Sequence, residues 1–92
     1  MKVNFYATLR PIVGGKTVEV EFAEGITLRQ ILQQLITRFP PLRTELFDEN
    51  DNLFGHVHVF LNGRDVAFLP DKLDTQLEPQ DAVNIFPPVG GG

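Results

Sequence analysis

The residues best suited to chemistry form the C-terminal tail, in which two prolines and a valine lead into three glycines: Pro87, Pro88, Val89, Gly90, Gly91 and Gly92. Glycine has no Cβ, so such a tail fits a narrow channel, while the prolines stiffen its exit. A free terminal carboxylate can attack the α-phosphate of ATP, and a sulfur or nitrogen nucleophile can open the resulting acyl adenylate. We expect Gly92 to be the residue that reacts. Residues 87–91 would thread a partner's channel, with a reach of about 20 Å for the whole tail.

Terminal glycines alone are also typical of a frayed end or an expression scar. Two features favour a functional tail in this chain. An alternating segment, residues 81–86, comes directly before it, and the two prolines follow that segment without a break. A scar would not continue a strand into a stiffened exit without side chains.

Composition limits the remaining possibilities. The 92 residues predict one domain, residues 1–92, with a globular part at 1–86 and a tail at 87–92. A net charge of -4 argues against nucleic-acid binding and makes a basic protein partner more plausible. The absence of cysteine excludes a disulfide, a thiolate nucleophile and a side-chain persulfide. No signal peptide or membrane span is apparent, so we expect a cytoplasmic protein that does not bind membranes.

Other chemical motifs are weak. His56 and His58 would share a strand face, but no third ligand is evident, so we predict no metal site. The acidic loop from Asp48 lacks the glycine and the bidentate acid of a calcium loop. The chain contains no serine for a Ser-His-Asp triad. We therefore expect no cofactor bound by this chain.

The N-terminal half should position the tail through a hairpin and a helix. Residues 3–9 alternate apolar and polar, Pro11 ends that strand, and Gly14-Gly15 would turn the chain into a second alternating strand at 17–22. Thr27 and Gln30 have the spacing of a capping box before an amphipathic helix at 28–39. Residues 40–41, both proline, would end the helix and lead into a polar loop at 42–55.

The C-terminal half predicts three more strands. Residues 56–61 alternate, Asn62-Gly63 is a strong turn signal before a short strand at 64–66, and residues 81–86 alternate again. The order strand, strand, helix, strand, strand, strand predicts an α+β fold, a mixed sheet with one main helix packed across it. This order resembles the β-grasp fold of ubiquitin.

Particular residues resemble the MoaD and ThiS sulfur carriers. Residues 87–92 are similar to the family's Pro-Pro-Val-x-Gly-Gly ending, with Gly90 at the variable position. Residues 5–10 look like the family's first strand, and residues 60–63 like its central turn. Arg10-Pro11, the longer loop around Phe47 and Asp65-Val66 are similar to the branch with CysO and the archaeal small modifiers.

The resemblance implies a function for the tail. A ubiquitin-activating-type enzyme would use ATP to adenylate Gly92, and sulfur would convert it to a thiocarboxylate. The large molybdopterin synthase subunit would then be the acceptor of a MoaD-like small subunit. Alternatives are a CysO-like carrier for cysteine or tRNA thiolation, a modifier joined to lysines, and a β-grasp interaction module with an inert tail.

A docking face can be predicted from the strand alternation. If the valines and isoleucines face the helix, Tyr6, Phe60 and Phe86 point to the other face, on strands that the β-grasp order makes neighbours. Exposed aromatic clusters are common at protein interfaces. Arg10 would add a charged contact at the rim. The alternative is three isolated surface aromatics.

Overall fold

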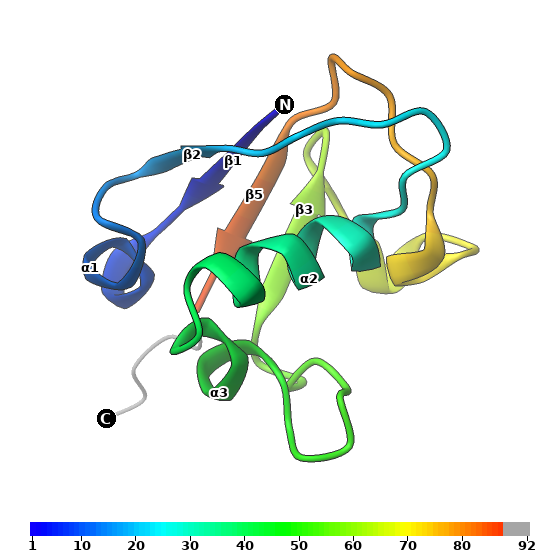
Figure 1. Cartoon of the computed structure of the whole chain (residues 1–92). Helices are drawn as coiled ribbons and strands as arrows, with labels where there is room; N and C mark the ends of the chain where they lie inside the picture. The colour runs from blue at the N-terminus through cyan, green and yellow to red at the C-terminus, as the bar shows by residue number, and fades with distance from the viewer. Residues whose placement is uncertain (88–92) are drawn as a thin grey trace.

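A computed structural model describes residues 1–87. Its five-stranded sheet has the order β2-β1-β5-β3-β4, and α2 crosses one face of it (Figure 1). The strands are β1 (Lys2–Phe5), β2 (Thr17–Glu19), β3 (His58–Leu61), β4 (Arg64–Asp65) and β5 (Val83–Phe86). The helices are α1 (Arg10–Val13), α2 (Leu28–Arg38) and α3 (Leu42–Leu46), with 3-10 turns η1 (Ala7–Leu9), η2 (Val66–Phe68) and η3 (Lys72–Asp74). The predicted α+β, β-grasp fold is confirmed.

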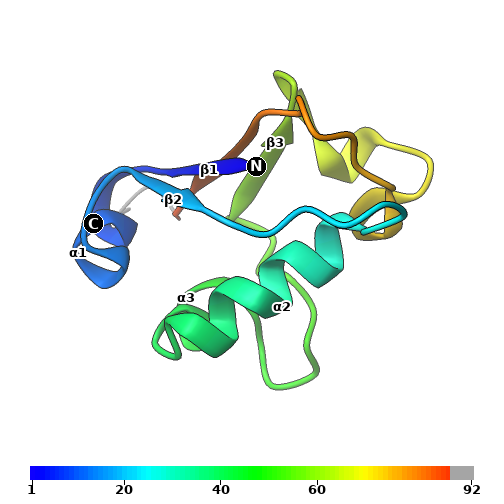
Figure 2. The same cartoon turned by 45° about the horizontal axis from the view of Figure 1, so that its top comes forward.

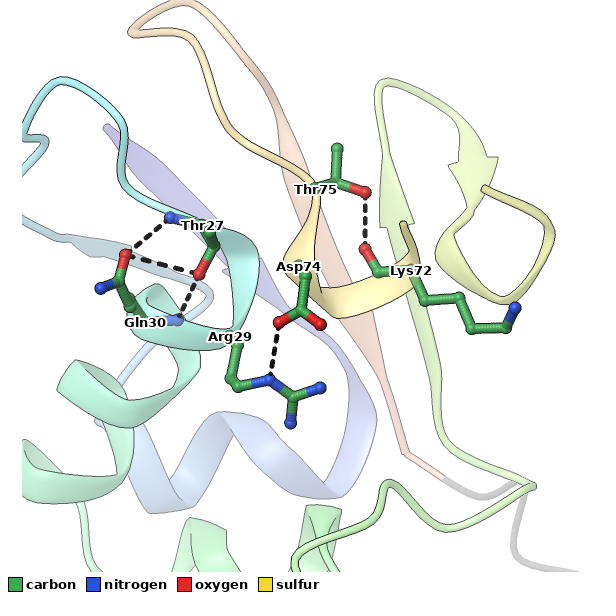
Figure 3. Close-up of polar contacts among 6 residues, drawn as sticks. All are labelled: Thr27, Arg29, Gln30, Lys72, Asp74 and Thr75. Carbon is green, nitrogen blue, oxygen red and sulfur yellow. Dashed lines mark hydrogen bonds and ion pairs between the residues drawn. The ribbon is translucent and has the colours of Figure 1, made fainter. Parts of the chain in front are cut away.

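Helix α2 begins at the predicted capping box. The Gln30 backbone N–H donates to Thr27 Oγ1 at 3.3 Å, and the Thr27 N–H donates to Gln30 Oε1 at 2.9 Å (Figure 3). These bonds satisfy amides that the first helical turn otherwise leaves without partners. The apolar stripe is fully buried against the sheet and consists of Leu28, Ile31, Leu32 and Leu35. Sequence periodicity therefore predicted this helix to within one residue of its C-terminal end.

Strand β5 lies in the middle of the sheet. It runs parallel to β1, with Val3 opposite Val83, and antiparallel to β3, with Val59 opposite Ile85. Alternation along β5 sends Val83 and Ile85 into the core and leaves Asn84 and Phe86 half-buried on the opposite face. The strand that leads into the tail is thus held on both sides.

The predicted strand at residues 3–9 is wrong beyond Phe5. The chain turns there into η1 and α1, and Ala7 adopts a left-handed φ of 52°. Pro11 stands in the first turn of α1, where its missing N–H costs nothing, and Gly14, with a φ of 79°, caps the helix by donating to the Arg10 carbonyl at 2.9 Å. The proline and glycine read as hairpin signals are therefore helix signals.

The predicted polar loop at 42–55 contains α3, which the sequence reading missed. Leu42 and Leu46, one helical turn apart, are both fully buried beside α2. The two prolines end α2 and also start α3, since Pro41 is its N-cap. The other strands are shorter than predicted, because β2 ends at Glu19, β3 begins at His58 and β4 ends at Asp65.

One apolar core connects all these elements. Figure 2 shows α2 and α3 together on one side of the sheet. The buried cluster includes β-strand residues such as Phe5 and Ile85, helical residues such as Leu35, and Leu73 and Leu77 from the irregular segment before β5. Within residues 1–87, no helix is both long and apolar enough to span a membrane.

Candidate functional site

The candidate site begins where β5 ends. Phe86 is the last residue of the strand, and Pro87, the last residue that the structure describes, is buried. The predicted tail positions Pro88, Val89, Gly90, Gly91 and Gly92 lie outside the described residues. Their predicted roles therefore stay predictions.

The three predicted aromatic residues meet on the sheet face opposite α2. The Tyr6 and Phe86 rings stack, with centroids 4.2 Å apart and planes 13° apart. Phe60 meets Phe86 edge-on, with centroids 5.4 Å apart and planes at 86°. All three are half-buried, and both geometries are favourable aromatic pairs. We call Tyr6, Phe60 and Phe86 the aromatic patch.

Arg10 lies at the rim of this patch, as predicted, although it comes from α1. Its Nε donates to the Phe5 carbonyl at 3.0 Å, and its Cζ lies 5.4 Å from the centroid of the Tyr6 ring. This distance allows a cation–π interaction. The turn into α1 places Arg10 beside the patch, and the hydrogen bond to the Phe5 carbonyl holds the guanidinium over the Tyr6 ring. In a continuing strand, this positive charge would lie farther from the patch.

A polar network beside the patch was missed by the sequence reading. Asn84 Oδ1 accepts hydrogen bonds from the Tyr6 hydroxyl at 2.9 Å and from Asn4 Nδ2 at 3.1 Å. Asn4 Oδ1 in turn accepts from the Thr17 hydroxyl at 2.8 Å. The network joins β2, β1 and β5 and holds the Tyr6 ring flat on Phe86. Alternation alone places Asn4 and Asn84 on this face, but only the strand register makes them direct partners.

A shallow hollow of about 260 Å³ is lined by Tyr6, Phe60, Gly63, Asn84 and Phe86. Apolar walls with one amide in them suit an apolar side chain of a partner protein.

The two histidines make other contacts. His58 pairs with Asp65, 3.0 Å from Nδ1 to Oδ2, and the His56 ring stacks on the Phe54 ring with centroids 5.5 Å apart. Residues 1–87 hold no group of three or more metal-ligand side chains.

Comparisons with known proteins agree with this architecture. The sequence pattern of the ThiS family matches residues 3–92. Small archaeal modifier protein 3 of Haloferax volcanii is 35% identical over 100% of this chain and 98% of its own length.

Solved structures of two related proteins have the same fold. A chain of the BexX/CysO complex from Amycolatopsis orientalis superposes with a TM-score of 0.81 at 29% identity, covering 99% of this chain and 98% of that one. A putative molybdopterin converting factor, subunit 1, from Pyrococcus furiosus gives a TM-score of 0.75 at 30% identity, with 96% and 95% covered. The chain belongs to the ThiS family, within the ubiquitin-fold group of sulfur carriers and protein modifiers.

Proposed function

We propose that this protein is a carrier activated at its C-terminal carboxylate, with Gly92 as the residue that receives sulfur. The observation that carries the proposal is the aromatic patch, because Phe86 ends the strand that leads into the glycine tail. A partner that binds the patch holds the exit of the tail at the same time. The globular part then serves to deliver the tail.

The proposed chemistry has two steps. A Gly92 carboxylate oxygen attacks the α-phosphorus of ATP on a ubiquitin-activating-type enzyme, and pyrophosphate leaves. Sulfide then attacks the carbonyl carbon of the adenylate as HS⁻, AMP leaves, and loss of the proton on sulfur gives the thiocarboxylate. This chain supplies the carboxyl group, while the partner supplies the ATP site.

Docking has to offset the cost of ordering the tail. Fixing the backbone of one residue costs about 1 to 2 kcal/mol, so a tail of several residues would bind weakly to a channel without a second contact. Fixed aromatic side chains are among the residues that contribute most at interfaces. The Tyr6–Asn84 hydrogen bond holds one ring of the patch before binding, and Arg10 adds a positive rim that would meet an acidic group of the partner. These contacts support a docking role for Tyr6, Phe60, Phe86 and Arg10.

The acceptor that we propose is the large molybdopterin synthase subunit, with this chain as its MoaD-like small subunit. Support comes from the likeness to the molybdopterin converting factor subunit. CysO-type transfer, to cysteine synthesis or tRNA thiolation, is supported to a similar degree by the likeness to the BexX/CysO complex. Both routes use the same thiocarboxylate.

A second candidate function is protein modification. The 35% identity to small archaeal modifier protein 3 favours it. In that case a lysine amine of a target attacks the carbonyl carbon of the Gly92 adenylate, or of a thioester that the adenylate forms with an enzyme thiol. AMP or that thiol leaves, the amine loses a proton, and an isopeptide bond forms. The activating step stays the same, so the nucleophile alone separates the two functions.

The test is to incubate the full chain with its cognate activating enzyme, ATP and sulfide. We expect the intact mass to rise by the difference between one sulfur and one oxygen, and fragment ions to place the change on Gly92. A chain lacking residues 91–92 is the control. An unchanged mass in a reaction that loads a known carrier would contradict the proposal, whereas Gly-Gly remnants on target lysines would favour the modifier.

A further inference from the structure

Phe68 is the one large apolar side chain within residues 1–87 that is strongly exposed, at 84%. It belongs to η2, which follows the edge strand β4. Asp65 caps this turn by accepting a hydrogen bond from the Ala67 N–H at 2.9 Å. An aromatic ring fixed in water costs free energy unless another surface covers it.

A cleft of about 500 Å³ lies directly beside Phe68, and we call it the Phe68 cleft. Its walls come from the segment before β3, from β3, from the end of β4 with η2, from η3, and from the start of α2. Its apolar lining comes from Leu53, Phe54, Val57, Val59, Val66 and Leu73. The volume falls in the range of about 300 to 1,000 Å³ that is typical of binding clefts. A large apolar side chain would fit between this lining and Phe68.

Two positively charged side chains at this cleft keep donors that are free within residues 1–87. Lys72 takes part in no ion pair within residues 1–87, and Figure 3 shows its side chain extending away from Asp74. Arg29 contacts Asp74 through Nε alone, at 3.0 Å, so its two Nη groups make no hydrogen bond within residues 1–87. Both side chains line the cleft.

The one acidic group that lines the cleft is already satisfied. Asp65 accepts from the Ala67 N–H with one oxygen and pairs with His58 Nδ1 at 3.0 Å with the other. Among the residues that line the cleft, the two cations Arg29 and Lys72 therefore outnumber the one anion, Asp65, although the protein carries a net charge of -4. Charge complementarity at this surface selects a negatively charged partner.

We propose that the Phe68 cleft binds an acidic peptide segment of a partner protein that carries one large apolar side chain. The apolar side chain packs against Phe68 in the cleft, and neighbouring carboxylates meet Lys72 Nζ and the Arg29 Nη groups. No lining residue of the cleft belongs to the aromatic patch. The protein can thus bind such a partner while its tail is engaged elsewhere, which goes beyond the proposed carrier function.

The first experiment selects binders from a random-peptide display library on the immobilised full chain. We expect the enriched peptides to combine a large apolar residue with adjacent aspartate or glutamate. Titration of a synthetic enriched peptide into the isotope-labelled protein should shift the backbone amides of residues 54, 66–68 and 72. Enrichment of neutral or basic peptides, no enrichment, or shifts confined to the aromatic patch would overturn the proposal.

Two variants sharpen the test. Lys72→Glu should weaken the enriched acidic peptide about tenfold and select basic peptides instead, since the charge at the cleft is reversed. Lys16→Glu makes the same charge change at an exposed site outside the cleft, and should leave the affinity unchanged. Phe68→Ser should weaken the peptide and leave thiocarboxylate formation on Gly92 intact.

Equal effects of Lys72→Glu and Lys16→Glu would show that net charge alone attracts the peptide, and would overturn the proposal. Concentration-dependent self-association of the wild-type chain that Phe68→Ser abolishes would do the same, because the cleft would then bind a second copy. An NMR spectrum of each variant establishes that it folds.

Discussion

The two faces of the sheet are built from the same strands, β1, β5 and β3, yet they differ in what their side chains do. On the face covered by α2, residues such as Val3, Phe5 and Ile85 have no exposed surface. On the open face, Phe60 and Phe86 remain half-buried and the polar side chains bond to one another across the strands. Alternation along each strand supplies both sets.

The covered face of the sheet contributes to stability, whereas the open face is arranged for binding a partner. Complete burial removes apolar surface from water and so stabilises the domain. Sideways contacts on the open face, such as the Tyr6–Phe86 stack, hold rings in place without covering them. A partner that binds these rings then loses little entropy in ordering them.

Phe5→Ala should give the largest loss, because it empties a fully buried site under α2. Large-to-small changes of this kind cost about 3 to 5 kcal/mol in the free energy of unfolding. Urea unfolding followed by circular dichroism measures the loss. Phe60→Ala on the open face is the matched control, with an expected loss of about 1 kcal/mol. Equal losses would mean that the two faces contribute alike.

Phe60→Asp should weaken binding of the protein to its activating enzyme. It places a charge in the aromatic patch, so we expect affinity for the cognate activating enzyme to fall by about 30-fold, as for a residue worth about 2 kcal/mol at an interface. Titration calorimetry measures the affinity. Phe68→Asp makes the same change outside the patch and should leave this affinity unaltered. If both variants bind equally well, the open face is not the docking surface.

Tyr6→Phe keeps the ring stacked on Phe86 and removes only the hydroxyl that donates to Asn84 Oδ1. We expect a loss of about 1 kcal/mol in the free energy of unfolding, the usual net contribution of one hydrogen bond. Urea unfolding is again the measurement. Tyr6→Ala, which also removes the stack, should lose more stability. Identical stability of the two variants would contradict a structural role for the ring.

Glu19→Gln should have the smallest effect, since this exposed carboxylate lies on the edge strand β2. A hydrogen bond from the N-terminal ammonium, 2.9 Å away, lowers the pKa of Glu19 below its ordinary value of 4.5. Its stabilisation is therefore present above about pH 4.5 and lost as the pH falls through the lowered pKa. Thermal unfolding at neutral and acidic pH should show a small difference from wild type that disappears in acid. A difference that grows in acid would contradict this assignment.

Local signals account for the elements that were predicted correctly. Helix α2 combines a capping box with an apolar stripe, and Asn62-Gly63 forms the expected turn, with left-handed φ values of 52° and 82°. The error at residues 7–13 has a physical reason. Alternation every second residue does not separate a strand from a short helical turn in which Leu9 is buried and Ala7 is exposed.

The candidate site was predictable where alternation and strand order sufficed. Tyr6, Phe60 and Phe86 meet as predicted, whereas the Asn4–Asn84 contact joins residues 80 positions apart and depends on register. The Phe68 cleft was not predicted because its lining comes from four separate stretches of the chain, at residues 29, 52–59, 65–68 and 72–73. No feature of the sequence distinguishes Phe68, which is exposed, from its neighbour Leu69, which is half-buried.

The central position of β5 also fixes when the protein can fold during synthesis. β1 and β3 have no shared neighbour until β5, the last strand within residues 1–87, pairs with both. A ribosome must therefore make and release residues 83–86 before the sheet closes, although α2 can form earlier from local contacts. In chains that end before β5, β1 and β3 stay unpaired with each other's side of the sheet, and proteases can degrade such incomplete chains. Only chains that have been synthesised as far as the start of the tail can therefore complete the sheet.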